Sequence, residues 1–122
     1  MDLILWRHAD ALPGSETLAD LDRPLSPKGV KQARRMGEWL NRVLPESARI
    51  LVSPALRTLQ TADALERRYK TVANLAPNGS VEQLLTESRW PTAREVTVVI
   101  GHQPTLGLTA AYLMGASHVT SD

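Results

Sequence analysis

The stretch Leu3-Ile4-Leu5-Trp6-Arg7-His8 decides the fold, because a short apolar run stops abruptly at two basic residues. The run is continuously apolar rather than alternating, which predicts a strand buried on both faces of a sheet. Apolar runs at 50–53 and 95–101 have the same character, and Arg57 and His102 follow them closely. Parallel strands end at one edge of a sheet, where ligands of open α/β sheets bind, so we expect these basic residues to meet there.

Two serine-proline pairs predict the helices that connect these strands. Ser26-Pro27 places a capping residue before a proline, a pattern typical of a helix start, and this helix is predicted to end near Pro45. Ser53-Pro54 repeats the pattern and predicts a second helix to about Tyr69. Apolar residues at intervals of mostly three and four predict the buried faces, which are Val30, Ala33, Gly37, Leu40 and Leu44 in the first helix, and Leu56, Leu59, Ala62 and Leu65 in the second.

The rest of the sequence continues the alternation of strands and helices. The remaining predicted elements are a weaker strand at 71–75, a short helix opened by a capping box of Ser80 and Gln83, and a last helix at 104–114 with Gly115 as its C-cap. This order predicts an α/β fold, a three-layer α/β/α sandwich with a mostly parallel central sheet. One domain is expected over residues 1–122, because two would be too small to bury separate cores.

The composition is that of an ordinary globular protein, with 43% hydrophobic and 22% charged residues. A formal net charge of +1 argues against a nucleic-acid-binding protein, which needs a strongly basic face. The sequence has no cysteine, which excludes a disulfide framework, a thiolate nucleophile and cysteine-bound zinc, and fits a reducing cytoplasm. No apolar run is long enough to cross a bilayer, so we expect a soluble cytoplasmic protein without membrane partners.

The basic residues at the strand ends make sense together rather than one at a time. A lone histidine there is usually a polar residue at the solvent boundary, and an arginine in the first turn of a helix opposes the helix dipole. Two imidazoles and two guanidiniums at one edge would repel one another unless an anion lay between them, and guanidiniums match phosphoryl oxygens two at a time. Paired histidines also bind metals, but arginines repel cations and no carboxylate is predicted to join the set. We therefore predict a phosphoryl site without a metal.

Four sequence blocks in a fixed order carry a resemblance to a known family. Over nearly its whole length the sequence resembles the histidine phosphatase (phosphoglycerate mutase-like) superfamily, and most of all its small SixA-type phosphohistidine phosphatases. The blocks are Arg7-His8-Ala9-Asp10-Ala11, Arg23-Pro24-Leu25-Ser26-Pro27-Lys28-Gly29, Leu51-Val52-Ser53-Pro54-Ala55-Leu56-Arg57-Thr58-Leu59-Gln60-Thr61-Ala62, and Val99-Ile100-Gly101-His102-Gln103-Pro104.

The resemblance implies roles for five of these residues and implies no cofactor. His8 is the nucleophile, Arg7 and Arg57 bind the phosphoryl oxygens, and His102 completes the pocket as a hydrogen-bond donor. Arg23 matches an arginine that reaches the phosphate in the SixA-type branch, although it equally suits a role in fixing the loop. His8 attacks phosphorus through an unprotonated nitrogen, while its other nitrogen donates a hydrogen bond to a backbone carbonyl. Water then hydrolyses the phosphohistidine intermediate.

The absence of an acidic residue after the third predicted strand bears on the choice of substrate. Larger members of the superfamily use a carboxylic acid after the third strand to protonate the leaving oxygen, whereas residues 75–80 contain no acid. Glu82 and Asp10 are the candidate proton donors, although Glu82 also suits a helix start and Asp10 a loop. A phosphorylated imidazole departs more readily, because imidazole titrates near neutrality. Residues 71–101 are too few for an enclosing lid, so we expect phosphohistidine on a partner protein, such as a histidine phosphotransfer domain.

Two alternatives remain open. The same residues suit a small-molecule phosphomonoesterase that uses Glu82 or Asp10 as its acid, and faster turnover of sugar or nucleotide phosphates would favour it. They also suit a non-catalytic phosphoprotein-binding module, although such a module has no need of an unprotonated histidine beside two arginines. Binding of phosphate or vanadate without an acid-labile phosphoenzyme would favour the module.

The last residues of the sequence carry two further expectations. Relatives continue beyond the position of Asp122 with further strands at the sheet edge, so we expect a shortened C-terminal edge. If the protein is no longer than this sequence, an unpaired edge strand favours self-association, which predicts reduced solubility or a dimer formed through that edge. His118 has no partner signal and is expected on the surface.

Overall fold

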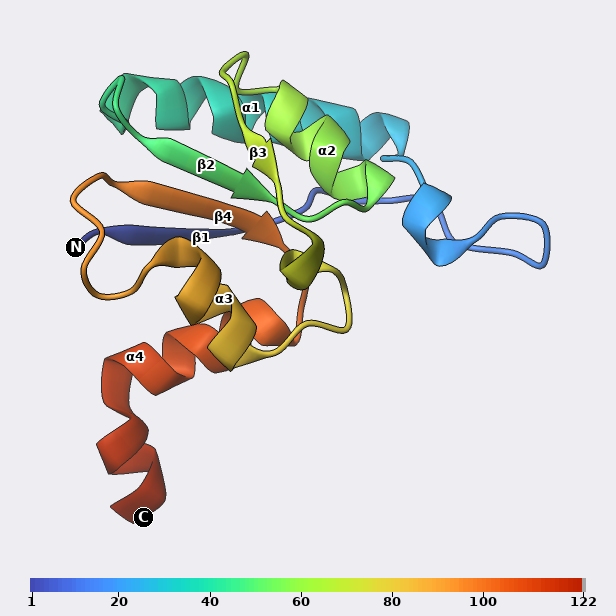
Figure 1. Ribbon diagram of the computed structural model, residues 1–122. Helices are drawn as coiled ribbons and strands as arrows, with labels where there is room; N and C mark the ends of the chain where they lie inside the picture. Colours follow the sequence, from blue (N-terminus) through green and yellow to red (C-terminus); the bar gives the residue numbers. More distant parts are fainter. Residues whose placement is uncertain (122) are drawn as a thin grey trace.

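Four parallel strands form the sheet in the computed structural model, which describes the backbone of residues 1–121 and the side chains of residues 1–115. The strands lie in the order β1 (Leu3–Arg7), β4 (Thr97–Gly101), β2 (Arg49–Val52) and β3 (Lys70–Thr71). All five residues of β4 are buried, because this strand has a neighbour on each side and helices over each face. The predicted parallel sheet is confirmed (Figure 1).

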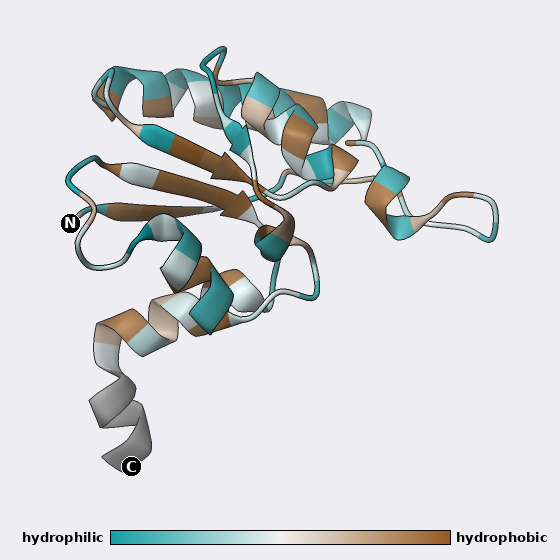
Figure 2. Ribbon diagram, viewed as in Figure 1, coloured by the Kyte–Doolittle hydropathy of each residue, from teal (hydrophilic) through white to brown (hydrophobic). Residues whose placement is uncertain are grey.

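Helices cover both faces of this sheet, as the predicted three-layer sandwich requires. Figure 1 shows α1 (Pro27–Val43) and α2 (Leu56–Asp63) on one face, with α3 (Val81–Ser88) and α4 (Thr105–Ser121) on the other. Figure 2 shows the strands as the most continuously hydrophobic segments, lying between these two layers. One apolar cluster lies on each side of the sheet, the first around Leu40, Val52 and Ile100, and the second around Leu51, Leu84 and Val99.

Helix α1 begins where the serine-proline pair predicts. The Ser26 hydroxyl accepts a hydrogen bond from Gly29 N at 3.0 Å, and Pro27 occupies the first turn. The buried face is Gly29, Ala33, Gly37 and Leu40, followed by Leu44, so the predicted stripe is confirmed except at its start. Val30 is 44% exposed and Gly29 takes its place, because a side chain at position 29 would overlap the carbonyl oxygen of Asp10.

Helix α2 is shorter than predicted at both ends. It begins at Leu56 after Ala55 rather than after Ser53, and it ends at Asp63 rather than near Tyr69. The Ser53 hydroxyl accepts a hydrogen bond from Ala55 N at 3.2 Å, but Ser53 lies two residues before the N-cap position, which Ala55 occupies. After Asp63 the chain turns through a left-handed residue, Glu66, with a φ of 53°.

The buried face of α2 is largely polar, which corrects the predicted apolar stripe. Leu56 and Leu59 are only half-buried, whereas the residues fully buried within the helix are Arg57, Thr58, Thr61 and Ala62. Their polar groups are largely satisfied locally, since the Thr58 hydroxyl donates to the carbonyl oxygen of Ala55 at 2.6 Å and that of Thr61 donates to the carbonyl oxygen of Arg57 at 2.8 Å. The helix therefore buries Arg57 and two threonines in place of Leu56 and Leu59, whereas Ala62, and Leu65 just beyond the helix, are buried as predicted.

The second half of the chain matches the predictions except in the strand at 71–75 and in the last helix, which is predicted to end at residue 114 but continues beyond Gly115 to Ser121. The strand predicted at 71–75 is reduced to β3 and a turn of 3-10 helix, η2 (Ala73–Leu75), while another such turn, η1 (Asp20–Asp22), precedes α1. The capping box of Ser80 and Gln83 is present, and α4 leaves helical geometry at Gly115, where the C-cap is predicted. His118 lies outside the described side chains. Within residues 1–121, β1 pairs with β4 alone.

Candidate active site

The ends of β1 and β4 bring the two predicted histidines together. Arg7 pairs in register with Gly101, and His8 N donates a hydrogen bond to Gly101 O at 3.1 Å. On the other side of β4, Ser53 N donates to Ile100 O at 3.1 Å. The centroids of the His8 and His102 rings are 5.3 Å apart, with 55° between their planes. Residues 94 positions apart in sequence therefore form one cluster, as the sequence predicts.

The local backbone fixes the protonation pattern of the His8 ring. Nδ1 of His8 lies 2.7 Å from the carbonyl oxygen of Ala9, which can only accept, so Nδ1 carries the proton and Nε2 keeps its lone pair in the neutral ring. The Ala9 N–H donates to the Thr61 hydroxyl at 3.1 Å, and this hydroxyl donates to Arg57 O. Thr61 therefore links the segment after β1 to α2 and helps to hold the Ala9 carbonyl in place.

Burial and positive neighbours keep His8 unprotonated. Burial lowers the pKa of His8 below its ordinary value of 6.5, and the charges of Arg57, Arg7 and Arg23 lower this pKa further. The hydrogen bond to Ala9 acts in the opposite direction, because it favours the protonated ring. The net pKa is lowered, so a neutral imidazole with a free Nε2 predominates at neutral pH.

Arg57 is buried beside the histidines, where its guanidinium has three partners. Its side chain is 4% exposed. Nη1 donates to the carbonyl oxygen of Asp20 at 2.7 Å, and Nη2 lies 3.1 Å from the Asp20 carboxylate and 3.4 Å from His102 Nδ1. Nε is buried without a hydrogen-bond partner among the described residues, so one donor of this guanidinium is unused.

His102 is neutral and has contacts at both ring nitrogens. Burial, with the charges of Arg57 and His8, lowers its pKa to about 4, although Asp20 opposes this change. Since arginine only donates, Nδ1 accepts from Arg57, and Nε2 carries the proton and donates to the Ser53 hydroxyl at 2.7 Å. In this geometry no ring proton of His102 is free, so the expected donation from His102 to a phosphoryl group would need the other tautomer.

A pocket of about 340 Å³ opens in front of His8. Its lining residues come from the end of β1, the segment that follows it and the first half of α1; they are Arg7, His8, Ala9, Asp10, Ala11, Arg23 and Gln32. Arg7 is exposed at the pocket, whereas Arg23 is half-buried. Arg23 Nε lies 3.2 Å from the Asp20 carboxylate but lacks the geometry of a hydrogen bond. Arg7, His8 and Arg23 therefore line this hollow, whereas Arg57 and His102 are not among its lining residues.

The two candidate proton donors lie in different places. Asp10 lines the pocket, and its carboxylate accepts a hydrogen bond from the Ser26 hydroxyl at 2.6 Å. Glu82 is exposed in the first turn of α3 and is not among the lining residues. The structure thus brings Asp10 to the site and leaves Glu82 outside its lining.

Sequence reasoning missed three residues that contact the predicted set. Asp20 contacts both Arg57 and Arg23, so the expectation that no carboxylate joins the basic residues is wrong. Ser53 contacts His102, and Thr61 binds Ala9. Asp20 precedes Arg23 by three residues, a spacing that predicts a contact between their side chains. Nothing in the sequence predicts the contact between Asp20 and Arg57.

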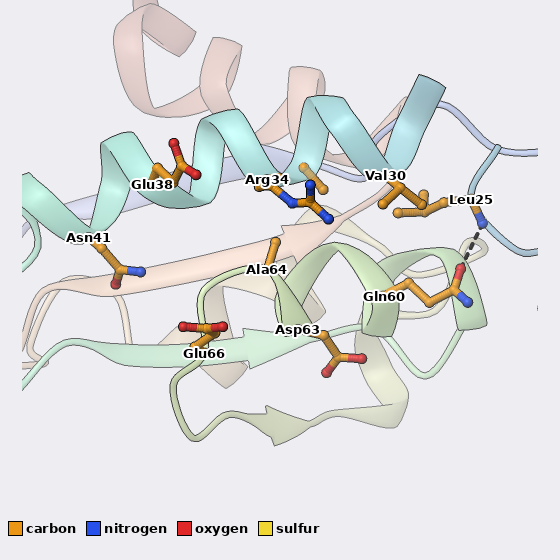
Figure 3. A pocket seen from close by; sticks show the side chains of 10 residues that line it. Leu25, Val30, Arg34, Glu38, Asn41, Gln60, Asp63, Ala64 and Glu66 are labelled. Carbon is orange, nitrogen blue, oxygen red and sulfur yellow. Dashed lines mark hydrogen bonds between the residues drawn. The ribbon is translucent and has the colours of Figure 1, made fainter. Parts of the chain in front are cut away.

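Other features of the described chain do not add to this site. A groove of about 500 Å³ lies between α1 and α2, and no histidine lines it. Figure 3 shows its lining side chains, among them Arg34, Glu38 and Gln60. Gln60 accepts a hydrogen bond from Leu25 N at 2.7 Å there, which ties the segment before α1 to α2. The side chains described through residue 115 include no group of three or more potential metal ligands. No described helix combines the length and apolar character needed to cross a membrane.

Comparison with known proteins gives consistent matches. Residues 3–90 match the model of the histidine phosphatase superfamily (branch 1). The chain is 31% identical over 121 residues to phosphohistidine phosphatase SixA of Escherichia coli, covering 93% of this chain and 74% of that protein.

Solved structures agree with the sequence match. A candidate phosphohistidine phosphatase SixA from Nakamurella multipartitia superposes with a TM-score of 0.80 and 37% identity, covering 98% of this chain and 69% of the other. A protein histidine phosphatase SixA in complex with tungstate gives a TM-score of 0.74 and 30% identity, covering 93% and 76% respectively.

Proposed function

The chain belongs to the histidine phosphatase superfamily and is a phosphatase, and from this premise we propose that it removes phosphate from phosphohistidine on a partner protein. The observation that carries this proposal is the His8 ring, which keeps Nε2 unprotonated beside three arginines. A nucleophile of this kind serves phosphoryl transfer and has no use in a protein that only binds phosphate.

The proposed reaction has two displacements at phosphorus. In the first, Nε2 of His8 forms a bond to phosphorus while the bond from phosphorus to the substrate nitrogen breaks. The substrate phosphoimidazole carries its proton on its other ring nitrogen, so the imidazole leaves as a neutral molecule and the departing nitrogen keeps the electron pair of the broken bond. In the second, water attacks phosphorus and the bond to Nε2 breaks, which releases inorganic phosphate and returns neutral His8. The hydrogen bond from Nδ1 to Ala9 O holds the ring through both steps and stabilises the cationic phosphoimidazole.

Arginines supply the positive charge that the transferring group needs. We assign Arg7, Arg57 and Arg23 to the phosphoryl oxygens, because guanidiniums donate pairs of hydrogen bonds to such oxygens. Two buried Nε atoms, those of Arg57 and Arg23, have no hydrogen-bond partner in the described chain, and a phosphoryl oxygen would satisfy such donors. His102 supports Arg57 through Nδ1 and adds no charge of its own.

The proposed leaving group, imidazole, suits a site that lacks a strong general acid. An alkoxide needs a strong proton donor, whereas imidazole departs readily once it carries a proton. Asp10 is the carboxylate that lines the pocket, and its Oδ2 already accepts a hydrogen bond from the Ser26 hydroxyl. We therefore propose that the substrate is phosphohistidine and that a histidine phosphotransfer domain in the cytoplasm presents it. The similarity to phosphohistidine phosphatase SixA of E. coli supports this substrate class.

A small-molecule phosphomonoesterase is the second candidate function, and the position of Asp10 at the pocket favours it. In that case Asp10 would protonate the leaving oxygen, and Asp10→Asn would slow ester hydrolysis while sparing phosphohistidine. Measuring both substrates with this variant separates the two functions.

The decisive experiment offers a phosphohistidine protein and p-nitrophenyl phosphate to the wild type and to His8→Ala. We expect faster turnover of the phosphohistidine protein and an acid-labile phosphoenzyme on rapid quenching, both abolished by the substitution. Arg34→Ala, which removes an arginine from the groove between α1 and α2, is the matched control and should keep full activity. Full turnover by His8→Ala would refute the nucleophile assignment, and binding of phosphate without a phosphoenzyme would favour the binding module.

A further inference from the structure

We propose that Asp20 is a positioning residue that orients Arg57 and Arg23 for the phosphoryl group. The proposal rests on the proposed function, because it assigns the two arginines to phosphoryl oxygens. Asp20 lies in η1, in the segment between β1 and α1, and its side chain is 59% exposed. Neither its position in the sequence nor its exposure marks it as part of the site, but its contacts do.

Asp20 binds Arg57 through both its backbone and its side chain. The carbonyl oxygen accepts from Nη1 at 2.7 Å, and Oδ2 accepts from Nη2 at 3.1 Å. Two acceptors from one residue on two nitrogens of a planar guanidinium fix the rotation of that plane. Asp20 therefore determines which donors of Arg57 remain available.

The donors that Asp20 leaves unused are those a phosphoryl oxygen needs. Nη2 also contacts His102 Nδ1 at 3.4 Å, which places one side of the guanidinium next to the pair of imidazoles. Nε is buried and lacks a partner in the described part of the chain. With Nη1 and Nη2 bound by Asp20, the Nε side of Arg57 is left for the substrate.

The same carboxylate also reaches the second arginine. Oδ1 of Asp20 lies 3.2 Å from Arg23 Nε, while Oδ2 holds Arg57, so the two oxygens bridge two guanidiniums. Both ion pairs found among the described side chains are made by Asp20. An exposed ion pair contributes little stability, so this arrangement is better explained by the geometry that it imposes on the two arginines.

Asp20 also holds its own segment at the site. Its carbonyl oxygen accepts a hydrogen bond from Arg23 N at 3.3 Å in addition to the one from Arg57, which closes the η1 turn against α2. The backbone contact survives any substitution at position 20, whereas the carboxylate contacts do not. A substitution therefore tests the side chain while much of the turn is retained.

Binding of orthovanadate tests the inference, because vanadate adopts the five-coordinate geometry of phosphoryl transfer and its dissociation constant does not depend on the active fraction. We expect Asp20→Ala to weaken vanadate binding about 10- to 100-fold, since loss of orientation is costly where charge must be matched in the transition state. Asp20→Asn keeps acceptor oxygens for Nη1 and Nη2 and should recover most of the affinity. Asp22→Ala, in the same turn but without a contact to either arginine, is the matched control and should bind as the wild type does.

The outcomes separate this inference from the proposed function. Wild-type affinity in Asp20→Ala would overturn the positioning role, and tighter binding would show that the carboxylate only competes with the anion. An equal loss in Asp22→Ala would show that the turn, rather than the carboxylate, matters, which also overturns it. If the wild type forms no phosphoenzyme, the proposed function fails, but the vanadate series still decides the role of Asp20.

Discussion

The imidazole of His8 faces that of His102 at a centroid distance of 5.3 Å, and Arg57 contacts the second of these rings. Two imidazoles this close to each other and to a guanidinium resist protonation. Burial and Arg57 lower the pKa of both rings, and the His8 charge is a further cause for His102. The site therefore gets its positive charge from arginines, while the histidines remain neutral, as the proposed nucleophilic role of His8 requires.

The first prediction concerns the titration of His8. Its pKa is lowered, so the unprotonated form should persist below pH 6.5, the ordinary value for histidine. NMR titration of the imidazole Cε1 proton, assigned with His8→Asn, measures this directly. In Arg57→Ala the midpoint should move back toward 6.5, because one positive neighbour is lost. A wild-type midpoint at or above 6.5 would contradict the lowered pKa.

The second prediction concerns stability against pH, for which His102 is the main cause. Its pKa is about 4 when folded and ordinary when unfolded, so below pH 6.5 the unfolded chain binds a proton that the folded chain does not. Stability is therefore complete above pH 6.5 and is lost as the pH falls toward 4, by about 3 kcal/mol. Urea unfolding at several pH values measures the slope, and His102→Asn should flatten it. An unchanged slope in this variant would exclude His102 as the cause.

The third prediction separates two buried threonines of α2. Thr61→Val removes the acceptor of Ala9 N and should cost about 1–3 kcal/mol of stability. It should also lower kcat, because the Ala9 carbonyl that orients His8 loses its support. Thr58→Val is the control, since the Thr58 hydroxyl donates to Ser53 O and Ala55 O without contacting Ala9. Equal losses of kcat in both variants, after correction for folded protein, would remove the special role of Thr61.

The fourth prediction concerns Arg57 itself. Arg57→Ala should retain the fold, because its main ion-pair partner, Asp20, is 59% exposed and can be solvated by water. Binding of inorganic phosphate should weaken and kcat should fall about 100-fold or more, by analogy with the loss of one donor to a developing charge. Calorimetric titration with phosphate, alongside far-UV circular dichroism, measures both effects. Phosphate affinity equal to that of the wild type would exclude Arg57 from the anion site.

The fifth prediction concerns the glycine at the start of α1. Gly29→Ala should destabilise the protein by about 1–3 kcal/mol, because its Cβ would overlap the carbonyl of Asp10, which is backbone and cannot move aside cheaply. Gly107→Ala in α4 is the control, since its Cβ meets only the flexible end of the Gln103 side chain. Thermal unfolding compares the two variants. An unchanged unfolding temperature in Gly29→Ala would show that the segment after β1 moves aside at little cost in stability.

Much of the fold could be predicted because its signals are local. The apolar runs at β1, β2 and β4, the serine cap of α1 and the capping box of α3 each depend on a few neighbouring residues. The length of α2 could not be predicted in this way. The helical pattern of the sequence continues past Asp63, and the turn at Glu66 contains no proline or glycine; it follows Leu65, whose carbonyl oxygen accepts a hydrogen bond from Asn41 of α1.

Some residues of the site could likewise be predicted from the sequence, and others could not. Residues at strand ends, such as His8 and His102, could be grouped because parallel topology places strand ends together. The burial of Arg57 and Thr61 contradicts their polarity, since an apolar pattern assigns the inward face of α2 to its leucines. Asp20 lies in an irregular segment, where no periodicity predicts which side chain it will meet.

The hydrogen bonds from Ser53 N to Ile100 O and from His8 N to Gly101 O use two successive carbonyls of β4. The segments that carry His8, Arg57 and His102 are thus anchored to a single dipeptide, whose internal dimensions are set by covalent bonds. The spacing between His8 and His102 is therefore set mainly by the sheet rather than by the helices that cover it. Amino-acid replacements can therefore accumulate on the exposed side of α3, which does not line the pocket, with little effect on the chemistry.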